Sequence, residues 1–389
     1  MSEAIPAGWK QIPLEEFTTL QRGHDLTKTQ FRPGQVPVAG SNGIIGYHDT
    51  ALAKAPGITV GRSGSVGKVT IYKEDFWPHN TSLYVRDFHG NDPIFAGYLL
   101  KSLDLARFKT GASVPTLDRN SFKSLPVVIP PLREQQAIAE TLSTVERAIE
   151  AQERIIQTTT ELKQALMQKL FSEGLRGEPQ KETEIGLVPE SWEVVELGKI
   201  AKIERGKFSH RPRNEPRFYG GQYPFVQTGD VSNCDGIIRT FTQTLNEDGL
   251  AISKMFQAGT ILITIAANIG FTGILEFDSA CPDSLIGITP SDNVNTEFLN
   301  YYLMTQQQEM DRLAPKGTQK NINIQFLRPW QVPLPSIEEQ TRISNTFSAA
   351  DKKIRLATEK KTALQGLFCT LLHELMTAQA RVYVPRVSA

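Results

Sequence analysis

The sequence predicts an α+β protein of two similar halves, in which two β-rich globular domains are separated by two long antiparallel helices. Three observations support this prediction: the chain repeats itself, each copy ends in a long helical pattern, and each copy contains short apolar runs separated by Gly and Pro. At 389 residues the chain is also longer than a typical single domain. We therefore expect two domains related by a pseudo-twofold internal repeat.

The repeat is clearest at the beginning and the end of each copy. The segment IPAGWKQIPLEEF, which starts at Ile5, is similar to VPESWEVVELGKI, which starts at Val188. The segment PPLREQQAIAETL from Pro130 is similar to PSIEEQTRISNTF from Pro335. The middle of each copy matches less well, and the second copy has extra residues, most of them between 200 and 262. A chain built in this way offers the same surface twice.

A central long-helix region is predicted over residues 129–174, with the helix itself beginning near residue 132. Two prolines at 130 and 131 precede it, and an apolar stripe runs through Ile138 and Leu142 toward Leu162 and Leu170 at a spacing near 3.5 residues. Gly174 stops the pattern, and the polar segment 175–187 is predicted to be a linker.

A distal helix is predicted over residues 334–380, followed by a tail at 381–389. Ser336 and Glu339 have the spacing of a capping box, and a second stripe runs from Ile343 to Leu375. Two unrelated surface helices are the alternative interpretation. Each stripe would extend for roughly 60 Å at about 1.5 Å per residue, which is more than one globule of this size could cover. Pairing of the two helices in a coiled coil is therefore favoured.

The globular domains are predicted at residues 1–128 and 188–333. Short runs typical of strands occur in both, at Gly57–Val60, Lys68–Tyr72, Gly259–Ile265 and Ser284–Thr289.

Charge and composition limit the possible functions. The 42 basic and 42 acidic residues cancel, which argues against a protein that holds DNA by itself through the phosphates. Either the basic residues cluster, or partner subunits supply much of the contact with the DNA backbone. No apolar run approaches the roughly 18 residues of a membrane span, so we expect a cytoplasmic protein. The three cysteines lie far apart without a Cys-x-x-Cys pair, which favours buried reduced thiols over disulfides or a zinc site.

Motifs for catalysis are incomplete. The segment from Gly61 to Lys68 resembles a phosphate-binding loop, but Arg62 replaces the first Gly of the motif and Val69 replaces the Ser or Thr that binds magnesium. The sequence has neither a Gly-rich methyltransferase loop nor an Asn- or Asp-Pro-Pro-aromatic segment, and Pro282-Asp283 is not followed by an acid-x-Lys. The six histidines have no metal-ligand spacing. We expect no catalysis, no metal and no cofactor in this chain.

Local clusters of positive charge favour DNA binding. Residues 202–217 hold six basic residues against two acidic ones, although a solvated loop is the alternative. Polar loops in both copies carry side chains that are able to read base edges. The candidate DNA contacts are Ser41, Asn42, Arg62, Ser63, Lys68, Asn80, Thr81, Lys109, Arg119, Arg205, Lys207, Arg211, Arg213, Arg217, Thr228, Asp230, Lys316, Lys320 and Asn321.

The chain resembles the specificity subunits of type I restriction-modification systems over nearly its whole length. The most specific segments are ETEIGLVPESWEVVELGKI from Glu182, LPVVIPPLREQQAIAETL from Leu125 and WQVPLPSIEEQTRISNTF from Trp330. GASVPTLDRNSF and GTQKNINIQFL are less specific. The resemblance implies two target-recognition domains, each of which reads half of a bipartite DNA site, joined by antiparallel helices. The short and divergent middle of each copy implies no particular base-reading residue.

The resemblance also implies the partners and their cofactors. Two methyltransferase subunits would dock on the repeated helical regions, and restriction/translocase subunits would join them. S-adenosylmethionine, the donor for adenine methylation, would belong to the methyltransferase partner, and ATP and Mg to the restriction partner. Two other functions stay open: a coiled-coil assembly scaffold whose globular halves bind protein, and an enzyme that acts alone. The basic segment argues against the first, and the missing motifs argue against the second.

Overall fold

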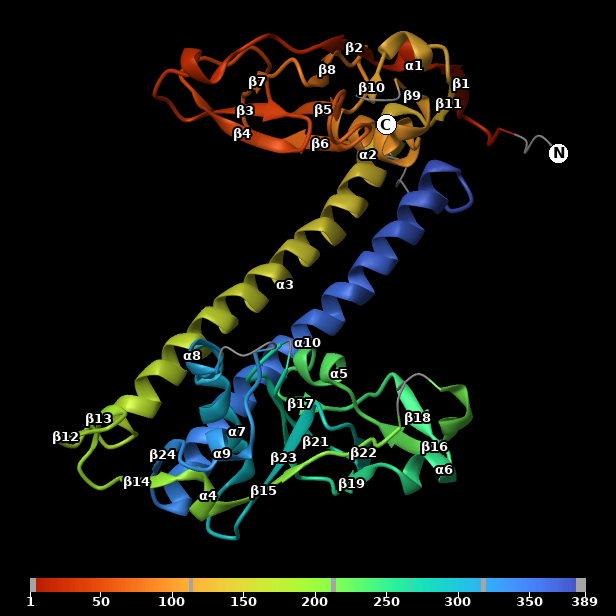
Figure 1. The fold of residues 1–389 in the computed structure, drawn as a ribbon. Coiled ribbons are helices and arrows are strands. Elements are labelled where there is room, and N and C mark those ends of the chain that lie inside the picture. Colours follow the sequence, from red (N-terminus) through yellow and green to blue (C-terminus); the bar gives the residue numbers. More distant parts are fainter. Residues whose placement is uncertain (1–4, 112–114, 211–214, 267, 316–319, 383–389) are drawn as a thin grey trace. The chain divides into compact units, whose positions relative to one another are not determined.

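The computed structural model describes residues 5–111, 115–210, 215–266, 268–315 and 320–382 (Figure 1). The chain forms two compact units. The first unit comprises Met1–Glu153 with Glu359–Ala389, and the second unit comprises Arg154–Thr358. The units divide both long helices, so each unit contains one globular domain, half of one long helix and half of the other.

The two long helices lie where the sequence predicts them. Helix α3 spans Leu132–Glu173 and helix α10 spans Ile337–Met376. Gly174 ends α3 with a φ of +65°, a left-handed conformation that glycine adopts without a steric penalty. The predicted capping box of α10 is half formed. The Glu339 amide donates to the Ser336 hydroxyl at 3.4 Å, but the Glu339 carboxylate bonds Leu175 instead.

The first unit is built on two sheets. One has the strand order β2-β8-β5-β6 and the other β4-β3-β7, while β1 pairs with β11 and β9 with β10. The elements are β1 (Lys10–Pro13), α1 (Leu14–Phe17), β2 (Thr19–Arg22), β3 (Val36–Gly40), β4 (Gly43–His48), β5 (Gly57–Gly61), β6 (Val69–Tyr72), β7 (Trp77–Pro78), β8 (Ser82–Asp87), α2 (Pro93–Ser102), β9 (Lys109–Thr110), β10 (Thr116–Leu117) and β11 (Pro126–Ile129).

The second unit repeats this plan with additions. Its sheets have the orders β15-β23-β20-β21-β17 and β18-β16-β22-β19, and β14 pairs with β24. The elements are β12 (Gln180–Thr183), β13 (Gly186–Pro189), β14 (Glu193–Glu196), α4 (Leu197–Ile200), β15 (Ala201–Arg205), β16 (Tyr219–Phe225), α5 (Thr228–Ser232), β17 (Ile237–Ile238), β18 (Gln243–Leu245), α6 (Glu247–Ala251), β19 (Lys254–Phe256), β20 (Ile261–Thr264), β21 (Thr272–Leu275), β22 (Ser279–Cys281), β23 (Leu285–Pro290), α7 (Thr296–Thr305), α8 (Gln307–Leu313), α9 (Ile324–Leu327) and β24 (Gln331–Leu334).

The internal repeat is therefore also a repeat of topology. The order β2-β8-β5-β6 corresponds to β15-β23-β20-β21, and β4-β3-β7 corresponds to β18-β16-β22. The predicted strands at 57–60, 68–72, 259–265 and 284–289 are confirmed as β5, β6, β20 and β23. The additions α5, β17, α6 and β19 lie among the extra residues of the second copy. The segment 175–187, predicted as a linker, contains strand β12 and the start of β13, which pair as a hairpin.

The same amide clamp joins each long helix to its globular domain. The Gln135 side chain accepts a hydrogen bond from the Asp92 amide at 2.9 Å, and Gln340 accepts one from the Asn295 amide at 2.8 Å. Asp92 and Asn295 are the N-caps of α2 and α7, so each clamp fixes the start of the short helix on the long one.

A buried carboxylate forms a second repeated joint. In the first unit Arg381 donates to Glu134 at 2.7 Å, and in the second unit Arg176 approaches Glu339 at 3.5 Å. Both glutamates are buried, and each arginine follows the long helix of the other copy. A charge-assisted bond therefore ties the end of one helix to the start of the other within each unit.

The helical stripes pack mainly into the domain cores. Ile138 and Leu142 lie with Leu375 in the core of the first unit, and Leu170 lies with Ile343 in the second. Within each unit the two helix segments therefore run antiparallel. Other positions of the predicted seam are open, because 55% of Leu162 and 46% of Leu367 are exposed to solvent.

Candidate nucleic-acid interface

The end of the main sheet is built in the same way in both units. Strand β2 ends at Arg22 and strand β15 at Arg205, and a glycine follows each of them. The amide of Gly23 donates to Ser82, the first residue of β8, and that of Gly206 donates to Leu285, the first residue of β23, both at 2.9 Å. A Cβ on Gly23 would lie 2.1 Å from the carbonyl oxygen of His79, and one on Gly206 would lie 2.2 Å from that of Pro282. Only glycine allows this close approach. Arg22 in the first unit and Arg205 in the second are therefore held at equivalent positions, each of which we call the Arg-Gly corner of its unit.

The loop that resembles a phosphate-binding motif connects β5 to β6 in the first unit. Its Arg62 and Ser63 amides both donate to the Thr81 carbonyl, at 2.9 and 3.1 Å. Ser63 also bridges to Thr116, just as Ala266 bridges to Asn321 in the second unit. The two divergent loops identified from sequence thus occupy equivalent positions.

The turn at Ser41-Asn42 joins β3 to β4 and lies against this loop. Lys68 donates from Nζ to both the backbone carbonyl and the side-chain oxygen of Asn42, at 3.0 and 2.8 Å. Lys68 therefore holds the turn. The Asn42 side-chain amide nitrogen has no partner among the residues that the structure describes, so it is available as a donor.

Four arginines surround a hollow of about 660 Å³ at this corner of the first unit. They are Arg22, Arg62, Arg86 and Arg119. Arg119 donates to the Leu20 carbonyl at 3.0 Å, whereas the Arg62 guanidinium has no hydrogen-bond or ionic partner in the described part of the chain. Such a hollow attracts an anion, because guanidinium groups provide donors in a geometry that matches phosphate or a base edge.

Asp25 balances part of this charge. It accepts a hydrogen bond from Asn80 and pairs with Arg22 at 2.9 Å. The Asn80 bond, and then the charge of Arg22, hold the pKa of the Asp25 carboxyl below its usual range. The aspartate stays charged and orients Asn80.

The first unit therefore gathers most of its candidates at one corner. These are Ser41, Asn42, Arg62, Ser63, Lys68, Asn80, Thr81 and Arg119. Lys109 is exposed on β9, which pairs with β10 beside the Ser63 bridge. Arg22 and Arg86 also line the hollow and were not among the predicted candidates, although the Arg-Gly dipeptide at Arg22 recurs at Arg205.

The second unit disperses its candidates more widely. Arg205 donates to the Asp283 carbonyl at 2.7 Å, and the Arg217 guanidinium lies 4.6 Å from the centre of the Phe218 ring. Lys207 is exposed after β15 and has no side-chain partner among the described residues. Thr228 starts α5, while Asp230 accepts from the Gln227 amide at 2.8 Å and so caps that helix.

Other candidates lie beside the equivalent of the first unit's loop. Lys320 pairs with Asp311 at 2.8 Å, and the buried side-chain oxygen of Asn321 has no hydrogen-bond partner in the described residues. Arg211, Arg213 and Lys316 lie outside the described residues.

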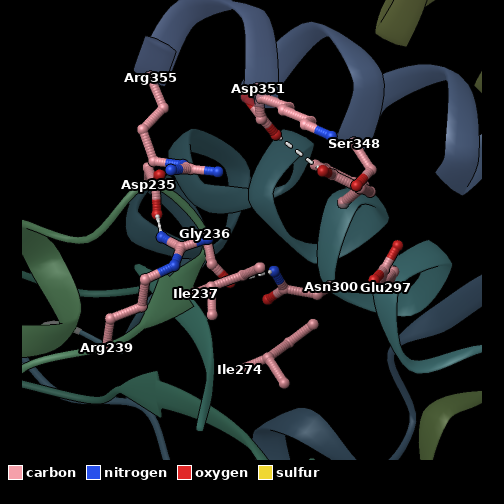
Figure 2. A pocket seen from close by; sticks show the side chains of 12 residues that line it. Asp235, Gly236, Ile237, Arg239, Ile274, Glu297, Asn300, Ser348, Asp351 and Arg355 are labelled. Atoms are coloured by element: carbon pink, nitrogen blue, oxygen red, sulfur yellow. Dashed lines mark hydrogen bonds and ion pairs between the residues drawn. The ribbon is translucent and has the colours of Figure 1, made fainter. Parts of the chain in front are cut away.

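A separate polar pocket of about 140 Å³ lies in the second unit between α7, β17 and α10. Asp351 and Asn300 line it from opposite sides (Figure 2). Asp351 accepts from the Tyr301 hydroxyl at 2.7 Å and from Lys163 at 2.6 Å, and burial raises the pKa of Tyr301. The pocket belongs to the attachment of the long helices, and β17, which lines it, is the edge strand opposite β15, the strand that ends at Arg205.

Two of the three cysteines differ from the prediction of buried thiols. Cys281 is buried, but Cys234 is partly buried and Cys369 is exposed on α10. In the described ranges, no three His, Cys, Asp or Glu side chains are placed to hold a metal ion. No described helix has both the length and the apolar character needed to cross a membrane.

Comparisons with known proteins agree with the repeat. The model of the type I restriction modification DNA specificity domain matches residues 6–160 and again residues 189–365. The putative type I restriction enzyme MjaX specificity subunit of Methanocaldococcus jannaschii is 28% identical over 82% of this chain and 76% of its own length. The MjaVIII specificity subunit of the same organism is 27% identical over 74% of this chain and 70% of its own.

A solved structure has the same fold. The S subunit of a type I restriction-modification system from M. genitalium superimposes with a TM-score of 0.70 over 96% of this chain and 97% of its own, at 20% identity. This likeness supports the two-domain, two-helix architecture alone. The family model, however, covers most of the sequence in two copies, one over each predicted half. The chain therefore belongs to the type I restriction modification DNA specificity family and carries two specificity domains.

Proposed function

We propose that the chain is the DNA-recognition subunit of a type I restriction-modification enzyme, and that each unit reads one half of a bipartite site. The observation that carries this proposal is the repeated corner: both units place an Arg-Gly dipeptide, the loop after β5 or β20 and the turn before β8 or β23 together. Two equivalent corners with different side chains are suited to two different half-sites.

The electrostatics of the first unit fit this role. The chain has no net charge, yet Arg22, Arg62, Arg86 and Arg119 surround one hollow. Arginines contact phosphates or bind guanine in the major groove, and the Asn42 amide is able to donate to a base edge. The clustered arginines therefore provide a local positive charge for binding DNA, although the chain as a whole has no net charge.

We propose further that catalysis resides in partner subunits. Two methyltransferase subunits would dock on the repeated helical surfaces and supply S-adenosylmethionine-dependent adenine methylation. Restriction/translocase subunits would add ATP- and Mg-dependent cleavage, and the assembly would act on DNA in the cytoplasm. The repeated clamps at Gln135 and Gln340 support a ratio of one chain to two methyltransferases, because a pseudo-twofold chain offers a docking surface twice.

Domain exchange tests the recognition proposal. Residues 1–128 are replaced by the corresponding domain of a relative with a different site, and the methylated sequence is read by methylome sequencing. We expect one half of the site to change and the other to persist. The matched control replaces residues 188–333 and should change the opposite half. A folded hybrid in which both halves change would refute separate reading.

Native mass measurement tests the assembly. The purified chain is mixed with its methyltransferase partner, and the mass of the complex is determined. A complex of one chain with two methyltransferases is expected, with no methylation by the chain alone. A one-to-one complex at saturating methyltransferase would refute the repeated docking surface.

A further inference from the structure

His79 lies at the centre of the first unit's corner and has a fully assignable hydrogen-bond pattern. Its Nε2 is 3.1 Å from the Leu26 carbonyl oxygen, and its Nδ1 is 2.9 Å from the Thr81 hydroxyl. A carbonyl oxygen only accepts, so Nε2 carries the ring proton. Nδ1 is also 3.4 Å from the Thr81 amide, which only donates, so Nδ1 accepts from that amide and from the Thr81 hydroxyl.

The chain of hydrogen bonds continues to the Ser41-Asn42 turn. The Ser41 amide donates to the Thr81 hydroxyl oxygen at 3.3 Å, and that oxygen accepts through a lone pair while its own proton is donated to His79. Four groups are thus joined in one direction, from Ser41 through Thr81 and His79 to Leu26. Every polar group in this chain of hydrogen bonds has a partner, and a fully satisfied network of this kind favours a single geometry.

The backbone around His79 joins the same loops. The His79 amide donates to the Ala39 carbonyl at 2.9 Å, at the end of β3, and the Thr81 carbonyl accepts from Arg62. The turn 79–82 therefore connects the loop of Arg62, the turn of Asn42 and the corner of Arg22. A shift of the His79 ring would move the donors that surround the arginine hollow.

The second unit lacks this histidine. The carbonyl that approaches Gly206 belongs to Pro282, as that of His79 approaches Gly23. Proline offers no side-chain hydrogen bond, and the Ser284 carbonyl accepts from Ile265 there, as the Thr81 carbonyl accepts from Arg62. The histidine relay is a feature of the first corner and not of the repeat.

We propose that His79 is a positioning residue for recognition of the first half-site, and that its ring and the Thr81 hydroxyl set the arrangement of the loops that carry Arg62 and Asn42. This inference rests on the proposed function. Its effect is local: loss of the relay alters discrimination at one half-site and leaves the other half-site unchanged.

The test uses the chain assembled with its methyltransferase. Affinity is measured by fluorescence anisotropy for the site identified by methylome sequencing and for two altered duplexes, one changed in each half. His79→Phe removes both ring nitrogens, and Thr81→Val removes the hydroxyl at constant shape. The matched control Thr81→Ser keeps the hydroxyl. With one or two hydrogen bonds lost, we expect discrimination at the first half-site to fall about 5- to 10-fold in His79→Phe and Thr81→Val.

The control readouts separate positioning from general destabilisation. Thr81→Ser should stay within about twofold of the unmodified chain. Discrimination at the second half-site should not change in any variant. In protein labelled with ¹⁵N-histidine, the His79 Nδ1 signal should shift in Thr81→Val and keep its position in Thr81→Ser. If His79→Phe does not fold, the Thr81 pair decides alone.

Two results would overturn the inference. Equal loss at both half-sites in Thr81→Val would assign the relay to stability of the whole protein. Unchanged discrimination in Thr81→Val, with the His79 signal shifted, would show that the relay does not position the loops. Failure of the proposed function looks different, because then the unmodified complex discriminates at neither half-site.

Discussion

The two long helices give a direct prediction about the distance between the half-sites. Both helices pass from one unit to the other, and an ion pair joins them in each unit. Glu153 pairs with Lys361 at 3.0 Å in the first unit, and Lys163 pairs with Asp351 at 2.6 Å in the second. A change in spacing therefore requires a matched insertion in both helices between these pairs. We choose four residues after Thr159 and four after Ala357.

The magnitude follows from helix geometry. Four residues lengthen each helix by about 6 Å and rotate it by roughly 40° beyond a full turn, which keeps both ion pairs near their original faces. One base pair adds about 3.4 Å and rotates the far half-site by about 35°. The added helix length of about 6 Å corresponds to one or two base pairs, and the added rotation of roughly 40° corresponds to one base pair. We expect the half-site sequences to persist and the unspecified spacer to grow by one pair.

Methylome sequencing of cells that express the double insertion measures the spacer directly. A four-residue insertion at the tip of the β12–β13 hairpin, after Glu184, is the control and should leave the spacer unchanged because it lies outside both helices. The insertion after Thr159 alone should weaken the assembly, because α10 still has its original length. An active double insertion that methylates the original spacing would refute the idea that the helices set the distance.

Three further predictions concern single side chains. Arg62→Ala should reduce the salt dependence of DNA binding by about one unit of slope, measured as log affinity against log salt, whereas Arg147→Ala on the outside of α3 should not; an unchanged slope would exclude a phosphate contact at Arg62. Lys163→Met should destabilise the second unit by about 3 kcal/mol, because it leaves Asp351 charged in a site where only 20% of its side chain is exposed. The double variant Lys163→Met with Asp351→Leu should recover most of that loss of stability. The control, Lys101→Met in the first unit, should reduce stability by about 1 kcal/mol. Hydrogen exchange measured by mass spectrometry reports the stability of each unit separately. Burial raises the pKa of the Cys281 thiol, so maleimide at pH 8 should label Cys369 and leave Cys281 unmodified; labelling of Cys281 in the folded chain would contradict its burial.

Much of the fold was predictable because it depends on periodic and repeated signals. The stripes of α3 and α10, the proline before α3 and the glycine after it are local patterns with a direct structural meaning. The repeat then predicted that both halves share one topology, and the strand orders confirm this. The hairpin formed by β12 and β13 was missed because the residues of β12 are polar, and polarity alone predicts a linker.

The structure brings several of the predicted candidate loops of the first unit together at one corner, but sequence did not predict which contacts their side chains make within the chain. Lys68 was chosen as a DNA contact, and the structure shows it bonded to Asn42. Asp230 was chosen for its position in a polar loop, and its carboxylate caps α5. Such assignments depend on which partner lies within reach, and that is decided by tertiary contacts between segments far apart in sequence. The sequence shows which side chains could form hydrogen bonds, whereas only the packed structure shows which of them already bond to other residues of the chain.

The two copies share the contacts that attach each domain to the long helices and differ in the side chains at their corners. The groups that attach each domain to the helices are buried and alike: Gln135 corresponds to Gln340, and Glu134 to Glu339. A buried amide or carboxylate that loses its partner costs about 1–3 kcal/mol or more, so these joints resist change. At the corners the fixed contacts are made by backbone, as when the Thr81 and Ser284 carbonyls accept from Arg62 and Ile265. Backbone contacts hold loop positions whatever the side chains are, which allows a histidine relay in one corner and a proline in the other. The side chains at each corner are therefore able to diverge without loss of the contacts that attach each domain to the long helices.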